Sequence, residues 1–120
     1  MASVVALALA GCTAFGPKIG LGGAVTGGIV GTVIGRDLDP AAQHAAHEAE
    51  YHALEYGKTG EVTAWKSGSA RGEVVAGPLY RVNSYDCRDY TDTITVGTAA
   101  PQSARATACR QANGIWQPVD

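Results

Sequence analysis

Hydrophobic and polar positions follow three different patterns in turn along the chain. Residues 19–35 carry no charged side chain, and residues 40–56 place small apolar residues at spacings of four and three. Residues 59–119 alternate apolar and polar positions in short runs. Spacings of three and four are typical of one helix face, and alternation is typical of strands. The pattern therefore predicts an α+β chain in which one short helix precedes a small antiparallel β-sheet.

The predicted helix has recognisable signals at both ends. Asp39 can cap its first turn, Pro40 suits the first helical position, and Gly57 ends it. One face consists of small residues and one tyrosine, at Ala42, Ala46, Ala49, Ala53 and Tyr56. Such a narrow face packs closely but stabilises little per residue. We therefore expect it to rest on the following domain or on a partner helix.

The opposite helix face is polar and contains His44, Glu48, Tyr51, His52 and Glu55. The spacing of His44, Glu48 and His52 would allow a surface metal ion. A solvated face with pairs at a spacing of four explains the same residues more simply. We therefore expect no metal ion and no cofactor.

The alternating region predicts four to six antiparallel strands. Its candidate strands are residues 62–66, 72–76, 79–83, 85–90, 91–96, 104–111 and 115–119. Asn113-Gly114 between the last two runs is a hairpin signal. Residues 66–71 are rich in Ser and Gly, and their first four residues predict a loop.

Glycines within residues 19–35 recur every four residues, at Gly23, Gly27, Gly31 and Gly35. In a helix they would form one smooth ridge opposite a branched apolar face, a glycine zipper. That helix would be about 26 Å long, near the lower limit for a membrane span. A flexible tether and a strand are the alternatives. The regular spacing favours a helix that embeds in a membrane or associates with copies of itself.

An apolar run near the start of the chain ends in a cysteine. Leu9-Ala10-Gly11-Cys12 has the pattern at which bacterial signal peptidases cut before a cysteine that carries a diacylglycerol. Residues 4–10 suit a signal h-region and are too short to span a bilayer. A buried strand or helix start is the alternative. No Lys or Arg precedes the run, as a signal peptide would normally have, which would fit a start codon upstream of Met1.

Cys87 and Cys109 remain once Cys12 is assigned to lipid attachment. An even remainder suits an oxidising compartment such as the periplasm and predicts one disulfide, with a pair of reduced core cysteines as the alternative. A crosslink that closes a loop of this length would stabilise by about 3 kcal/mol in the chain-entropy model.

Composition and motifs disfavour nucleic-acid binding and catalysis. The 120 residues have a formal net charge of −2, without the basic excess that nucleic-acid binding needs. Neither Ser67 nor Ser69 has the spacing of a nucleophile elbow. Asp86, Asp89 and Asp92 would scatter over both faces of a strand, so they make no carboxylate pair. We therefore expect a protein that is not an enzyme.

Two arginines beside the cysteines are candidate binding residues. If Cys87 and Cys109 lie in strands, Arg88 and Arg110 lie on the opposite sheet face, because side chains alternate. Asp86 and Tyr90 share the face of Arg88, and this group could bind an anion or a partner. An Arg–Asp pair with an aromatic lid on a half-exposed face is the simpler interpretation.

Several short motifs follow one another in a characteristic order. They are the cysteine motif at 9–12, the glycine repeat through Gly35-Arg36-Asp37-Leu38-Asp39, the alanine-rich helix, Val62-Thr63-Ala64-Trp65, Cys87-Arg88-Asp89-Tyr90-Thr91, Ala108-Cys109-Arg110 and Asn113-Gly114-Ile115-Trp116. Together they resemble the rickettsial seventeen-kilodalton surface antigen family. Its members are outer-membrane lipoproteins with a glycine zipper and a C-terminal surface-antigen domain.

This resemblance implies an outer-membrane location and an envelope role without chemistry. We expect a lipoprotein signal at 1–11, a lipid-anchored zipper at 12–36, the helix at 37–57 and the sheet domain at 58–120. The expected partners are membrane lipid, through acylated Cys12, and further copies of the chain, through the zipper. The sequence does not indicate which protein, if any, the chain binds. The alternative is a periplasmic binding or inhibitor module whose 66–71 loop inserts into a target.

Overall fold

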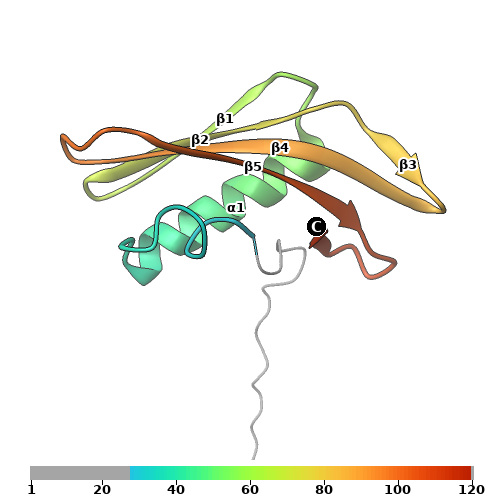
Figure 1. Cartoon of the computed structure of the whole chain (residues 1–120), viewed down its shortest axis with the longest axis horizontal. Helices are drawn as coiled ribbons and strands as arrows, with labels where there is room; N and C mark the ends of the chain where they lie inside the picture. Colours follow the sequence, from blue (N-terminus) through green and yellow to red (C-terminus); the bar gives the residue numbers. More distant parts are fainter. Residues whose placement is uncertain (1–27, 120) are drawn as a thin grey trace, which may run out of the picture.

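The computed structural model describes residues 28–119, which form one helix packed along one face of a β-sheet (Figure 1). The helix is α1 (Pro40–Tyr56). The strands are β1 (Val62–Ser67), β2 (Ala70–Ala76), β3 (Tyr80–Val82), β4 (Tyr85–Val96), β5 (Gln102–Arg110) and β6 (Trp116–Val119). The predicted α+β class is confirmed, and the sheet has six antiparallel strands, within the predicted four to six, all following the helix.

The long strand β4 organises the sheet. Every pairing is antiparallel, the strand order is β1-β2-β4-β5-β6, and β3 pairs with the beginning of β4. The predicted runs 85–90 and 91–96 are therefore one strand of 12 residues. In Figure 1 the β3–β4 hairpin extends past the end of α1.

The expected loop at 66–71 is wrong, because these residues form most of a tight hairpin. Lys66 pairs with Arg71 and Ser67 with Ala70, so β1 and β2 are joined by a two-residue turn. Gly and Ser are as common in such turns as in longer loops. The stretch is therefore a hairpin turn and not an open loop.

The predicted helix ends are confirmed. The Asp39 side chain accepts a hydrogen bond from the Ala42 amide at 2.8 Å, and Gly57 follows the last turn. The four predicted alanines are buried, and the buried stripe also includes Glu50 and Leu54. Tyr56 was expected inside but is 65% exposed, and its ring lies perpendicular to that of Tyr51 with the ring centroids 6.1 Å apart.

Small residues line both sides of the contact between α1 and the sheet. The inner face of β2 presents Ala70, Gly72, Val74 and Ala76, and that of β5 presents alanines. Trp65 of β1 lies across Gly72, where an added Cβ would meet the Trp65 ring nitrogen at 2.5 Å. This contact therefore contributes little apolar volume to the core.

Residues 28–38 complete this core, and their conformation contradicts the predicted zipper helix in this part of the chain. Gly31 and Gly35 have φ angles of +91° and +68°, which a right-handed helix excludes. The segment forms turns instead, and it lies beside α1 on the same side of the sheet (Figure 1). Its buried side chains are Ile29, Val30, Ile34 and Leu38.

The packed unit therefore begins well before residue 37, the expected start of the helical part. Gly23, Gly27 and Cys12 lie outside the described residues, so their predicted roles stay predictions. Within residues 28–119, no helix is both long and apolar enough to cross a membrane.

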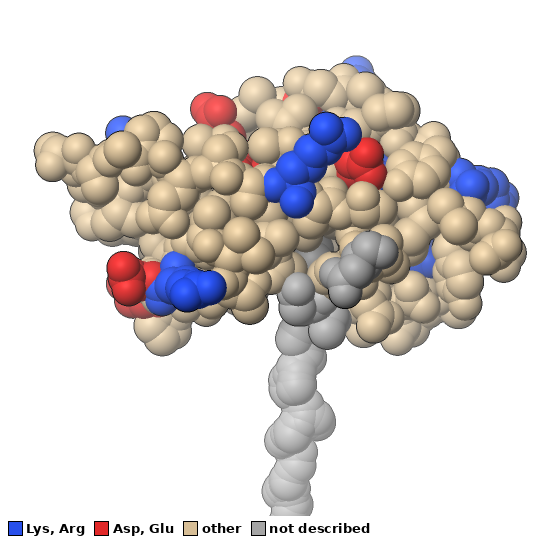
Figure 2. All heavy atoms as spheres, in the orientation of Figure 1, with Lys and Arg blue, Asp and Glu red and all other residues tan. Residues whose placement is uncertain are grey.

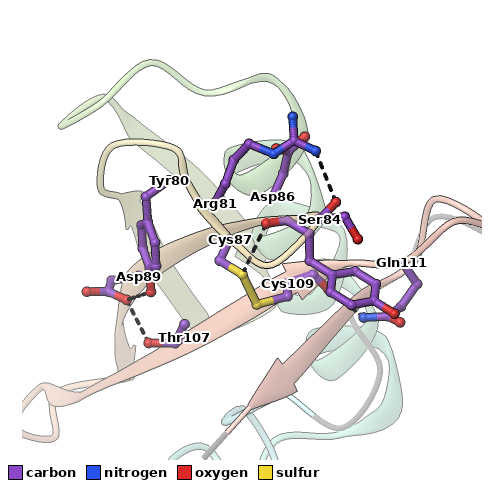
Figure 3. The surroundings of a disulfide bond; sticks show 10 residues. Tyr80, Arg81, Ser84, Asp86, Cys87, Asp89, Thr107, Cys109 and Gln111 are labelled. Carbon is purple, nitrogen blue, oxygen red and sulfur yellow. Dashed lines mark hydrogen bonds and ion pairs between the residues drawn. A yellow bond between two sulfur atoms is a disulfide. The ribbon is translucent and has the colours of Figure 1, made fainter.

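The other sheet face is open and polar and carries the predicted disulfide, which is confirmed (Figure 3). Cys87 and Cys109 occupy directly opposite positions on β4 and β5. Nearby, Asp89 accepts hydrogen bonds from Thr107, Tyr80 and Arg105 at 2.6, 3.0 and 3.1 Å. The hydrogen bonds from Thr107 and Tyr80 lower the pKa of Asp89 below its ordinary value.

Substitution of Gly35 tests the role of residues 28–38. At Gly35 an added Cβ would lie 2.9 Å from Ile94 Cδ1, whereas at Gly60, which also has a positive φ, it would meet nothing within 4 Å. Both alanine variants carry the backbone strain, but only Gly35→Ala also crowds the core. Chemical denaturation should show that Gly35→Ala costs about 1 kcal/mol more than Gly60→Ala. Equal losses would show that residue 35 does not pack on the sheet.

Candidate functional site

A pocket of about 560 Å³ opens where α1 ends beside the sheet. Three basic side chains, Lys58, Arg88 and Arg110, line it together with Glu55, Asp86 and the apolar residues Leu54, Leu79 and Trp116. A pocket of this size is within the range of small-ligand sites. It brings together two of the three candidate binding residues that the sequence indicated, Arg88 and Arg110.

Arg88 holds the end of α1 onto the sheet. Its Nη1 donates to the carbonyl oxygens of Ala53 and Leu54 at 3.1 and 2.9 Å, and its Nε donates to Gly77 at 2.8 Å. The last carbonyls of a helix have no partner within the helix, and a cation there also meets the negative end of the helix dipole. Burial lowers the pKa of the Arg88 guanidinium, which nevertheless stays charged.

Arg110 forms a second, more exposed polar group at the pocket. Its Nε donates to Glu55 Oε1 at 3.0 Å, and Trp116 Nε1 donates to the same oxygen at 2.9 Å. Glu55 lies in the last turns of α1, while Arg110 and Trp116 belong to the paired strands β5 and β6. This contact fixes the far sheet edge to the helix.

The three candidate binding residues lie on the predicted face of the sheet, but that face is not half-exposed as expected. Arg88, Tyr90 and Arg110 all lie opposite the cysteines, yet α1 covers most of this face. Tyr90 is 1% exposed and belongs to the core, so it does not line the pocket. The expected Arg–Asp pair is also wrong for Arg88, because Asp86 lies 3.7 Å from Arg81 instead.

A buried acidic pair, which the sequence analysis missed, lies under the middle of α1. Glu50 of α1 and Asp92 of β4 are fully buried, and Tyr90 lies beside them. No backbone amide and no other side chain of residues 28–119 donates a hydrogen bond to their side-chain oxygens. A proton on Glu50 supplies one hydrogen bond from Glu50 to Asp92. Burial and the neighbouring carboxyl raise the pKa of Glu50 to about 11.

One sequence signal could have revealed this pair. Glu50 follows Ala46 by four residues, on the face that the alanines define, and Asp92 alternates in phase with Tyr90 and Ile94. Both positions are therefore inward by spacing alone. Charged residues were instead assumed to be exposed, because they are almost never fully buried unless paired.

The remaining polar groups on the described surface do not converge on a site. His44 Nε2 lies 3.4 Å from Glu48 Oε2 on the exposed helix face, which is a pair at a spacing of four. No group of three His, Cys, Asp or Glu side chains within residues 28–119 is arranged to hold a metal ion. Figure 2 shows few and scattered charges on the viewed face, with positive and negative side chains often adjacent.

Replacement of Arg88 should destabilise the domain far more than replacement of Arg110. Arg88→Met leaves the Leu54 and Gly77 carbonyls without a donor, while the Ala53 carbonyl keeps the Gly57 amide at 3.0 Å. This loss should cost about 2–4 kcal/mol of unfolding free energy. Arg110→Met removes a partly exposed ion pair while Trp116 still binds Glu55, so its cost should stay near 1 kcal/mol. Urea denaturation of both variants measures the difference. Equal costs would contradict the capping role of Arg88.

The acidic pair predicts that the domain loses stability as the pH rises. Folding raises the pKa of Glu50, so the folded state retains a proton that the unfolded chain releases above its ordinary pKa. This contribution is complete below that ordinary value and declines as the pH approaches 11. One such group changes the unfolding free energy by about 1.4 kcal/mol per pH unit within this window. His47, Asp92 and Tyr90 are the titratable groups that act on the pair.

Glu50→Gln supplies a donor to Asp92 without a proton that titrates. Denaturation measured between about pH 5 and pH 9 should give a flatter profile for Glu50→Gln than for the unmodified chain. Glu48→Gln, at an exposed position of the same helix, should leave the profile unchanged. A profile that is the same for all three proteins would show that Glu50 does not carry the buried proton.

Comparison with known proteins identifies the family. The 17 kDa surface antigen of Rickettsia bellii (strain RML369-C) is 36% identical over 90 residues, which are 72% of this chain and 56% of the relative. The corresponding antigens of Rickettsia felis and Rickettsia rickettsii are 33% identical over 86 residues, 69% of this chain and 54% of theirs. The chain thus spans about half the length of these relatives. No protein-family profile matches it, and no solved structure does. The chain belongs to the 17 kDa surface antigen family.

Proposed function

We propose that this chain is a lipoprotein of the outer membrane, held by an acylated Cys12, which carries its sheet domain in the envelope and catalyses no reaction. The observation that carries the proposal is the family membership, since the relatives are named surface antigens. The Cys87–Cys109 disulfide supports it, because such bonds persist in oxidising compartments outside the cytoplasm.

The proposed anchor has two parts with different roles. The acyl chains on Cys12 supply membrane affinity, and a second signal is needed for stable attachment. We assign that second signal, and any self-association, to the glycine repeat before residue 28, which includes Gly23 and Gly27. Gly31 and Gly35 serve the sheet domain instead, because their turns pack residues 28–38 against it.

The sheet domain has one face available for display. Its inner face is covered by α1 and residues 28–38, whereas its outer face carries the hydrogen-bonded cluster around Asp89 and rows of threonines. A rigid polar surface of this kind suits recognition from outside, as the name of the relatives implies for them. The alternative of an inhibitor that inserts a 66–71 loop is less favoured, because these residues form a tight hairpin.

Replacement of Cys12 tests the anchor. In a bacterium that processes lipoproteins, the mature chain should begin at Cys12, carry the added mass of acyl chains and fractionate with the outer membrane. Cys12→Ser should abolish the added mass and move the chain to the soluble fraction.

Gly27→Leu serves as the matched control for this experiment. It should keep the acylation and the membrane location but weaken crosslinked oligomers, if the repeat before residue 28 associates. An unacylated wild-type chain, or a Cys12→Ser variant that stays in the membrane fraction, would refute the proposed anchor.

A further inference from the structure

Arg88 is a buried cation whose counter-charge is missing from the described part of the chain. Its side chain is 5% exposed, and all its hydrogen bonds are to neutral carbonyl groups. No carboxylate within residues 28–119 forms an ion pair with it. Burying a charge without an opposite charge is costly, and buried charges are normally paired. An anion at this position would therefore be bound favourably.

One nitrogen of Arg88 is left for such an anion. Nε and Nη1 are occupied by Gly77, Ala53 and Leu54, whereas Nη2 forms no hydrogen bond within residues 28–119. Arg88 also lines the pocket at the end of α1. The helix C-terminus and the β2–β3 connection therefore fix the guanidinium in place before any ligand arrives. Such preorganisation lowers the cost of binding.

The other charges of the pocket leave a positive excess. Lys58 lines the pocket and forms no ion pair with any residue of 28–119. The two acidic residues of the lining are already engaged, Glu55 with Arg110 and Asp86 with Arg81. The two unpaired cations, Lys58 and Arg88, therefore belong to the same cavity. The partial negative charge of the helix end offsets about half a charge of this excess.

We propose that this pocket binds the free carboxylate end of a short peptide. A carboxylate has two oxygens, which match the two available donors, Arg88 Nη2 and the Lys58 ammonium. Leu79, which is 58% exposed, offers apolar contact to a small side chain next to the carboxylate. Inorganic phosphate has no side chain that could use the apolar contact at Leu79. The volume of about 560 Å³ accommodates a ligand of two or three residues.

The proposal is tested by calorimetric titration of the full chain in detergent micelles. The probes are N-acetyl-alanyl-alanine, the same peptide with a C-terminal amide, and inorganic phosphate. The acid should bind at least about tenfold more tightly than the amide, since only the acid carries the charge that Arg88 lacks. Phosphate should bind more weakly than the acid.

Two lysine variants locate the site without disturbing the Arg88 contacts. Lys58→Gln should weaken binding of the acid by about three- to tenfold, a loss of one charged donor. Lys66→Gln, in the β1–β2 hairpin, should leave the affinity unchanged. Equal affinities for acid and amide, tighter binding of phosphate, no heat with the acid, or equal losses in both lysine variants would each overturn the proposal.

Discussion

The close contact between the alanine face of α1 and the small residues of the inner sheet face is the interaction on which the rest of the structure depends. Alanine on both sides lets the helix approach closely but buries little apolar area per residue. The core therefore needs further apolar side chains from outside this contact. Residues 28–38 supply four of them, and Trp65 and Trp116 also pack into the core. The end of the glycine repeat is thus part of the sheet domain.

The same close approach explains the polar groups inside the domain. The sheet lies directly under the end of α1, so that Arg88 of β4 reaches the last helix carbonyls. Under the middle of the helix, Glu50 and Asp92 are buried together without a hydrogen bond from a basic side chain of residues 28–119, and burial raises the pKa of Glu50 so that it keeps its proton. One polar group fixes the helix end, and the other makes stability depend on pH.

Local sequence signals predicted the elements well, because those elements are fixed by local chemistry. Asp39, Pro40 and Gly57 set the helix ends, alternation set the strands, and cysteine pairing followed from the count. The glycine repeat was different, since glycine suits both a smooth helix ridge and turns with positive φ. Only the apolar surface left open by α1 and the sheet decides between them at Gly31 and Gly35. The pairing of Glu50 with Asp92 and the burial of Arg88 likewise depend on contacts distant in sequence.

Hydrogen exchange of the full chain is the most direct test of the claim that residues 28–38 complete the sheet domain. The amides of Val33 and Ile34 both donate to the Ile29 carbonyl, at 2.9 and 3.1 Å. The account predicts that they exchange slowly and lose protection together with the amides of β4 during denaturation. Rapid exchange of these two amides while β4 stays protected would contradict it. Protection of these two amides that appears only when the chain is bound to a membrane would also contradict the account.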